Sequence, residues 1–116
     1  MSASAGSAGQ LDVEIAEEEG RTTLRLRGEL DIATAQRLEQ ALAHTSMLRG
    51  GTLVIDLGGV AFMDSTGLRV LIRANRAAGE GGYRFAVVTG GSPAERVFEL
   101  TRVHEHIEIV ADPAAL

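Results

Sequence analysis

The amino-acid sequence contains no cysteine. A disulfide framework, a cysteine-based zinc site and a thiol nucleophile are therefore all excluded. Aromatic residues make up only 3% of the chain, and the formal net charge is −5. Proteins that bind nucleic acids need cations for the phosphates and often aromatic rings on which bases stack. We therefore expect no nucleic-acid partner.

The sequence also lacks a long apolar run. No stretch approaches the length that spans a bilayer, and the opening MSASAGSAGQ has neither the basic start nor the apolar segment of a signal peptide. We expect a flexible N-terminal tail over residues 1–10, no membrane partner and a cytoplasmic location. Hydrophobic residues make up 45% of the 116, enough for the packed core of one domain over residues 11–116.

Hydrophobic periodicity predicts the first three elements. Alternation of apolar and polar residues predicts strands over 11–18 and 22–28, joined as a hairpin by a turn at Gly20. The period then changes to that of a helix over 34–48. The residues on its apolar face are Ala35, Leu38, Ala41, Leu42 and Thr45.

The rest of the chain alternates between short apolar runs and helical patterns. Strands are predicted over 52–57, 83–89 and 107–110, with helices over 65–78 and 92–102 between them. The resulting order, β-β-α-β-α-β-α-β, predicts an α/β domain. Its mixed sheet would consist of the N-terminal hairpin and then alternating β/α units, packed against helices.

Two serines stand where predicted helices begin. Ser92 is followed by Pro93 and Glu95, a pattern that predicts a capping box with Ser92 as N-cap. Ser65 follows Asp64, which we expect to cap the helix and to place Ser65 at its first position. The plain alternative is that Ser65 is itself only a cap.

Gly67 favours a further role for Ser65. Glycine inside a helix costs about 0.5–1 kcal/mol relative to alanine, and no turn is needed at this position. We interpret Gly67 as removing side-chain bulk beside Ser65, so that another molecule can approach the hydroxyl.

Motifs for catalysis, cofactors and metals are lacking. The G-x-S-x-G elbow of serine hydrolases and the phosphate-binding G-x-x-x-x-G-K-[ST] loop do not occur. No histidine is placed by its spacing near Ser65 as a base. His104 and His106 offer two imidazoles without a clear third ligand, an arrangement typical of a solvated strand entrance. We expect no catalytic residue, no cofactor and no metal.

Two polar patterns surround Ser65. Ser65, Arg69, Arg73 and Arg76 fall within an arc of about 80° on one helical face. This stripe either surrounds a modifiable hydroxyl or is simply an exposed basic face. Asp31 follows an earlier strand directly and would face Ser65 if the two strand ends lie side by side. The plain alternative is that Asp31, or Thr34, caps the helix after it.

Three segments together carry a family resemblance: GELDIATA at 28–35, LVIDLGGVAFMDSTGL at 53–68 and GSPAERVFELTRV at 91–103. Their joint occurrence in this order resembles the STAS-domain anti-sigma-factor antagonists. The resemblance implies partner switching in transcription regulation, such as stress or sporulation signalling. The unphosphorylated protein would bind an anti-sigma factor that is also a serine kinase and so release the sigma factor. That kinase would phosphorylate Ser65, and a serine phosphatase would restore the active form.

The resemblance also implies a binding surface and no enzymatic activity. Its residues would be Asp31, Asp64, Ser65, Thr66, Gly67, Arg69 and Arg73. The chain departs from the family pattern at Arg69, where many members have a small residue, and in its short C-terminal end. An alternative role for such a domain is that of an accessory subunit of a lipid transporter or of a signalling scaffold.

Overall fold

The structure is a computed structural model, and it describes residues 10–116. The predicted tail over 1–10 lies, apart from Gln10, outside these residues. The elements in chain order are β1 (Leu11–Glu18), β2 (Arg21–Leu30), α1 (Ala35–Ala43), β3 (Thr52–Met63), α2 (Ser65–Gly81), β4 (Arg84–Val88), α3 (Ala94–Thr101), the short turns η1 (Val103–Glu105) and η2 (Pro113–Ala115), and, between these turns, β5 (Glu108–Val110).

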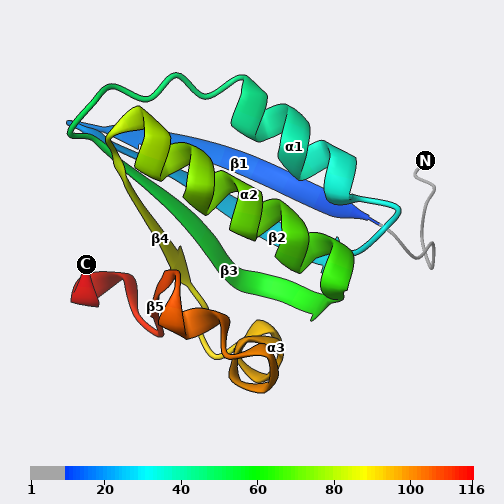
Figure 1. Ribbon diagram of the computed structural model, residues 1–116. Coiled ribbons are helices and arrows are strands. Elements are labelled where there is room, and N and C mark those ends of the chain that lie inside the picture. The colour runs from blue at the N-terminus through cyan, green and yellow to red at the C-terminus, as the bar shows by residue number, and fades with distance from the viewer. Residues whose placement is uncertain (1–9) are drawn as a thin grey trace.

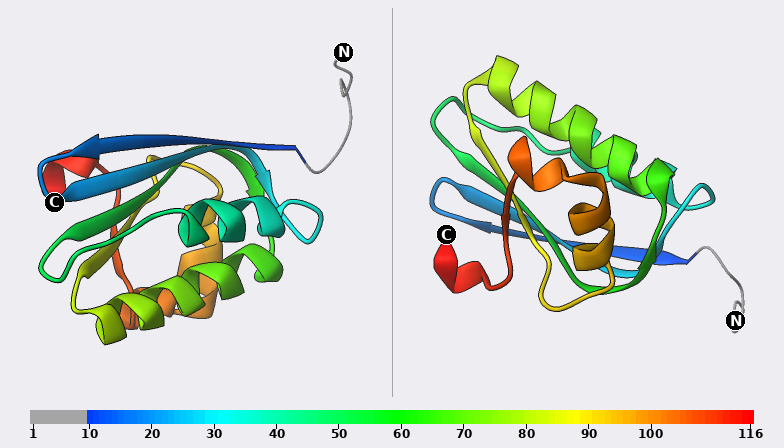
Figure 2. Two further views of the ribbon diagram at one scale, coloured as in Figure 1. Left: turned by 90° about the horizontal axis from the view of Figure 1, so that it is seen from above. Right: turned by 60° about the horizontal axis from the view of Figure 1, so that its bottom comes forward.

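The five strands form one sheet in the order β1-β2-β3-β4-β5. β1 and β2 pair antiparallel, and the remaining pairs are parallel. The predicted mixed sheet, an N-terminal hairpin followed by β/α units, is thus confirmed. Figures 1 and 2 show α1 and α2 lying along the same face of this sheet.

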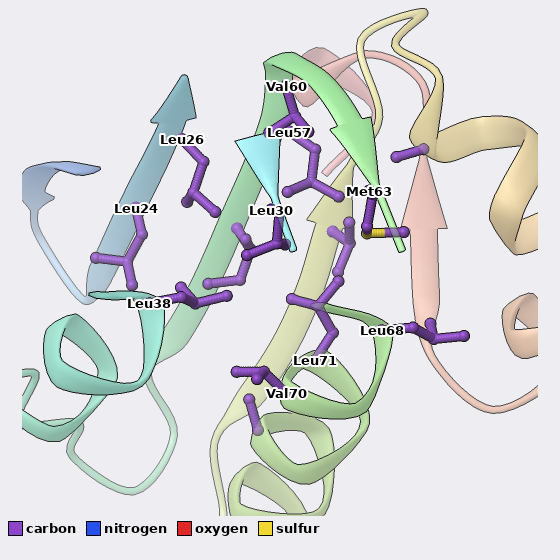
Figure 3. Packing of buried hydrophobic residues seen from close by; sticks show 14 of the residues in the cluster. Leu24, Leu26, Leu30, Leu38, Leu57, Val60, Met63, Leu68, Val70 and Leu71 are labelled. Carbon is purple, nitrogen blue, oxygen red and sulfur yellow. The ribbon is translucent and has the colours of Figure 1, made fainter. Parts of the chain in front are cut away.

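The core lies between the sheet and these two helices. Leu24 and Leu26 of β2 face it, because alternate residues of a strand point to the same side. Leu38 of α1 and Leu71 of α2 are fully buried in the same core (Figure 3). α2 therefore packs on the core along its length, and its first turn lies where β2 and β3 end.

β3 is twice as long as the predicted strand 52–57. It continues through Gly58 and Gly59, beyond the end of the predicted strand, and ends only at Met63. Two register shifts between β2 and β3 allow the pairing to continue. A Cβ atom on Gly59 would lie 2.9 Å from the Leu26 carbonyl oxygen, so the close approach of β2 accounts for this glycine. The extension brings the end of β3 level with the end of β2.

α1 is shorter than predicted. It ends at Ala43 instead of continuing to residue 48. The Thr45 hydroxyl donates a hydrogen bond to the Ala41 carbonyl oxygen over 2.8 Å, which stabilises the chain as it leaves the helix. Of the predicted apolar face, Ala35 and Leu38 are buried.

The capping box predicted at Ser92 is wrong. α3 begins at Ala94, and no side chain caps it. The Glu95 carboxylate accepts a hydrogen bond from the Thr89 hydroxyl at 2.8 Å. The Ser92 hydroxyl is buried without a partner among the described residues. Thr89, which directly follows β4, thus engages Glu95, and neither half of the box forms.

The far edge of the sheet carries the only resolved pKa shifts among residues 10–116. Arg84 of β4 forms a salt bridge with Glu108 of β5. The hydrogen bond from Arg84 lowers the pKa of Glu108, and the same bond raises the pKa of Arg84. Both side chains are exposed, so this pair belongs to the surface of the sheet edge.

No helix within residues 10–116 is long and apolar enough to cross a membrane. The same part of the chain contains no group of three or more acidic or histidine side chains placed to hold a metal ion.

Candidate functional site

The ends of β2 and β3 lie side by side. Leu30 pairs with Met63 in the parallel register, and the Asp64 amide donates to the Leu30 carbonyl oxygen over 3.2 Å. Figure 3 shows Leu30 and Met63 at this end of the sheet. The loop that begins at Asp31 therefore starts beside Asp64, which meets the condition on which the sequence placed Asp31 near Ser65.

The first turn of α2 is held by Asp64. This residue has an extended backbone, and its carboxylate accepts hydrogen bonds from the amides of Thr66 at 2.9 Å and Gly67 at 3.3 Å. The predicted N-cap is confirmed. Ser65 is consequently the first helical residue, and its side chain is exposed.

The Ser65 hydroxyl has no hydrogen-bond partner within the described residues. A serine that acts as a catalytic nucleophile needs a base within hydrogen-bond reach. In residues 10–116 no such base contacts Ser65. The hydroxyl instead points to solvent from the amino end of a helix, where the macrodipole favours negative charge.

The loop after β2 is shaped by Asp31. Its carboxylate accepts hydrogen bonds from the amides of Ala33 at 2.9 Å and Thr34 at 3.1 Å. The Thr34 hydroxyl in turn donates to the Glu29 carbonyl oxygen over 2.7 Å, and the Thr34 side chain is fully buried. Asp31 is half-buried and therefore stabilises the backbone of this loop beside α2.

The four members of the predicted stripe, Ser65, Arg69, Arg73 and Arg76, are all exposed. Two of the arginines nevertheless differ in what they contact. Arg73 pairs with Glu39 of α1 at 2.7 Å and so joins the two helices. Arg69, one turn from Ser65, has no ion pair within residues 10–116. Near Ser65, Arg69 is thus a cation available to another molecule.

Comparison with known proteins shows the family of the chain. A family model described as Mlab, STAS domain matches residues 13–111. An anti-sigma-F factor antagonist of Mycobacterium tuberculosis is 34% identical over 90 residues, which cover 78% of this chain and 73% of the relative. The chain belongs to the STAS-domain family of anti-sigma-factor antagonists.

A second curated relative and a solved structure extend the likeness. An anti-sigma-B factor antagonist of Listeria monocytogenes is 31% identical over 100 residues, 85% of this chain and 88% of the relative. The crystal structure of an anti-sigma factor antagonist from Mycobacterium paratuberculosis superposes with a TM-score of 0.75 at 25% identity. It covers 92% of this chain and 91% of the other. The predicted STAS fold is thereby confirmed.

Gly67 has a different function in this STAS domain from the one that the sequence suggested. It is buried, and a Cβ atom there would lie 2.6 Å from the Leu30 Cγ and 3.0 Å from the Leu30 carbonyl oxygen. Close packing of α2 on the end of β2 therefore accounts for the glycine. The expectation that it clears space beside Ser65 for an incoming molecule is corrected.

Two exposed apolar residues near Ser65 were missed. Ile32, in the loop after Asp31, is 81% exposed, and Phe62, near the end of β3, is 50% exposed. Phe62 precedes the inward-facing Met63, so the alternation of the strand could have indicated an outward side chain. Ile32 follows the end of a strand and lies in a turn, where an outward side chain is also expected. Both lie beside the STAS corner that holds Asp64 and Ser65.

The cap provides a prediction for this STAS domain. Asp64→Ala removes the acceptor for two amides and should lower the free energy of unfolding by about 1 kcal/mol. Asp64→Asn retains an acceptor oxygen and serves as the control, with a loss of only a few tenths of that amount. Urea unfolding of the three proteins measures the difference. Equal free energies of unfolding for Asp64→Ala and wild type would show that the cap does not stabilise the domain.

Proposed function

We propose that this STAS domain is an anti-sigma-factor antagonist whose binding is switched at Ser65. In the unphosphorylated state it would bind an anti-sigma factor that is also a serine kinase, and the sigma factor would be released. The kinase would then phosphorylate Ser65, and a serine phosphatase would remove the phosphate. The observation that carries this proposal is the exposed Ser65 hydroxyl at the amino end of α2, which has no hydrogen-bond partner in residues 10–116. The names of the two curated relatives support the same class of partner.

The position of Ser65 suits a switch that leaves the fold intact. Phosphorylation adds a charge of about −1.5 to −2. The amides and macrodipole at the start of α2, which is 17 residues long, stabilise negative charge there. A partner surface that fits a neutral hydroxyl offers the phosphate no compensating charge. Binding would then require the phosphate to lose its hydration water or to lie against groups that repel it. Binding would therefore be lost while folding is retained.

We assign the neighbouring residues different roles in this binding. Asp31 and Asp64 would hold the two loops in the shape that the partner meets, and Thr66 would lie at the rim of the contact. Arg69, a cation without an ion pair in residues 10–116, would meet an acidic group of the partner. Arg73 would contribute less, because Glu39 already neutralises it. The domain would act by stoichiometric binding and would carry out no reaction of its own.

The test is a binding titration with a phosphomimetic variant. Each kinase-type anti-sigma factor of the organism that carries this chain is purified and titrated, one at a time, into the STAS domain. Calorimetry measures the affinity. Ser65→Glu should bind the factor that wild type binds at least about 100-fold more weakly, since it places a charge in the interface. Circular dichroism should show an unchanged fold.

Ser46→Glu is the matched control for charge. Ser46 is exposed and lies in the loop after α1, away from the corner, so this variant should bind like wild type. Wild type that binds none of the kinases would contradict the proposal. Equal binding of Ser65→Glu and Ser46→Glu would instead favour an accessory or scaffold role in which Ser65 is dispensable.

A further inference from the structure

Five large hydrophobic side chains are exposed in the part of the chain that the structure describes. They are Ile15, Ile32, Leu48, Phe62 and Leu100. Single exposed apolar residues are normal on a protein surface, and Ile15, Leu48 and Leu100 come from three separate places, β1, the loop after α1, and α3. Ile32 and Phe62 differ, because the chain brings both of them to the corner where β2 and β3 end.

Their positions around Ser65 follow from the sheet register. Phe62 pairs with Glu29, one step before the paired ends Leu30 and Met63. Since Met63 is buried in the core, the alternation of the strand directs Phe62 away from it. Ile32 lies just beyond Leu30, in the loop that starts beside Asp64. One apolar side chain thus comes from each of the two segments that meet at Ser65.

Both side chains are carried by a backbone that is already ordered. Phe62 belongs to a hydrogen-bonded strand. Ile32 lies between Asp31, whose carboxylate accepts hydrogen bonds from the amides of Ala33 and Thr34, and the buried side chain of Thr34. A partner would therefore gain apolar contacts here with little entropy lost by this chain. Residues of this kind, at the centre of an interface, provide much of the binding energy.

Resting on the proposed function, we infer that Ile32 and Phe62 are the two anchors of the surface that binds the anti-sigma factor. The partner then presents an apolar recess to these side chains and a carboxylate to Arg69, the nearby cation that no acidic group of residues 10–116 neutralises. Because Ser65 follows Phe62 by three residues at this corner, a partner that covers both anchors also covers the Ser65 hydroxyl and removes its water. A phosphate at Ser65 would have to lose its hydration water in the closed interface. The free-energy cost of this desolvation releases the partner.

The experiment compares serine substitutions at exposed apolar positions. Ile32→Ser and Phe62→Ser should each weaken binding of the anti-sigma factor by about 10-fold or more. Leu48→Ser, at a residue that is 81% exposed like Ile32, and Leu100→Ser, at one that is 71% exposed, are the matched controls. These should stay within about twofold of wild type. Thermal melts confirm that each variant is folded before its affinity is compared.

A salt series tests how phosphate releases the partner. The ratio of the Ser65→Glu affinity to that of wild type should be the same at about 0.1 M and about 1 M salt, because screening does not remove a desolvation cost. Arg69→Ala, by contrast, should lower binding at low salt and match wild type at high salt. A Ser65→Glu deficit that disappears at high salt would assign the switch to repulsion and overturn this part of the inference.

The outcomes separate this inference from the function on which it rests. If wild type binds none of the kinases, the proposed function fails. If wild type binds and both corner variants bind as well as Leu48→Ser, only the anchors are refuted. A concentration-dependent dimer that Ile32→Ser and Phe62→Ser abolish would make the surface a contact between two copies of the chain, which also overturns the inference.

Discussion

Ser65→Ala is expected to abolish phosphorylation of this protein by its kinase. Ser65 is the exposed hydroxyl at the start of α2, and alanine leaves no acceptor there. Incubation of the kinase with ATP and each protein, followed by mass spectrometry, measures the incorporated phosphate and locates it. We expect one phosphate on wild type, at Ser65, and none on the variant.

The neighbouring hydroxyls provide the controls. Ser92→Ala should be phosphorylated like wild type, because the Ser92 side chain is buried and a kinase cannot reach it in the folded protein. Thr66→Ala should also retain the modification, provided that the Asp64 cap is kept. Unchanged incorporation into Ser65→Ala would refute the assignment and move the acceptor to another hydroxyl.

Gly67→Ala is expected to destabilise the domain by about 1–2 kcal/mol. The added methyl group would lie 2.6 Å from the Leu30 Cγ, and Leu30 is fully buried. Overpacking of this kind costs about 1–3 kcal/mol, partly offset by about 0.5–1 kcal/mol from the better helix propensity of alanine. Urea unfolding monitored by circular dichroism gives the change in the free energy of unfolding.

Gly79→Ala in the same helix should change stability in the opposite direction. Gly79 is exposed, and nothing lies within 4 Å of the position that its Cβ atom would occupy. The substitution should therefore stabilise the domain by about 0.4–1 kcal/mol. If both variants are stabilised by the same amount, Leu30 moves aside freely and the packing explanation for Gly67 is wrong.

Features that depend on local physics could be predicted from the sequence. The alternation of Leu24 and Leu26 with polar residues is a strand signal that needs no distant partner. Asp64 was recognised as an N-cap because a short carboxylate before a helical pattern satisfies amides only two and three residues away. The order of the elements then constrained the topology, since parallel strands need helical crossovers.

Features that depend on contacts between distant segments could not be predicted. The capping pattern at Ser92 is complete in itself, yet Thr89, which directly follows β4, donates its hydroxyl to Glu95. The continuation of β3 through Gly59 depends on the register with β2. Gly67 shows the same limit, because Leu30, which explains it, lies 37 positions earlier in the chain. Tertiary contact decided the cases of β3 and Gly67, whereas Thr89 and Glu95 lie only six positions apart.

The sequential order of the strands has a consequence for how the chain acquires its fold. Each strand pairs with the strand that precedes it in the chain, so none has to wait for a segment that is synthesised later. Arg21 pairs with Thr52 and Thr52 with Arg84, so each parallel pairing must still close a loop that contains a helix, which slows folding. During translation the hairpin can form first and β3 can then add to it. The corner at Ser65 would thus be complete before β5 leaves the ribosome.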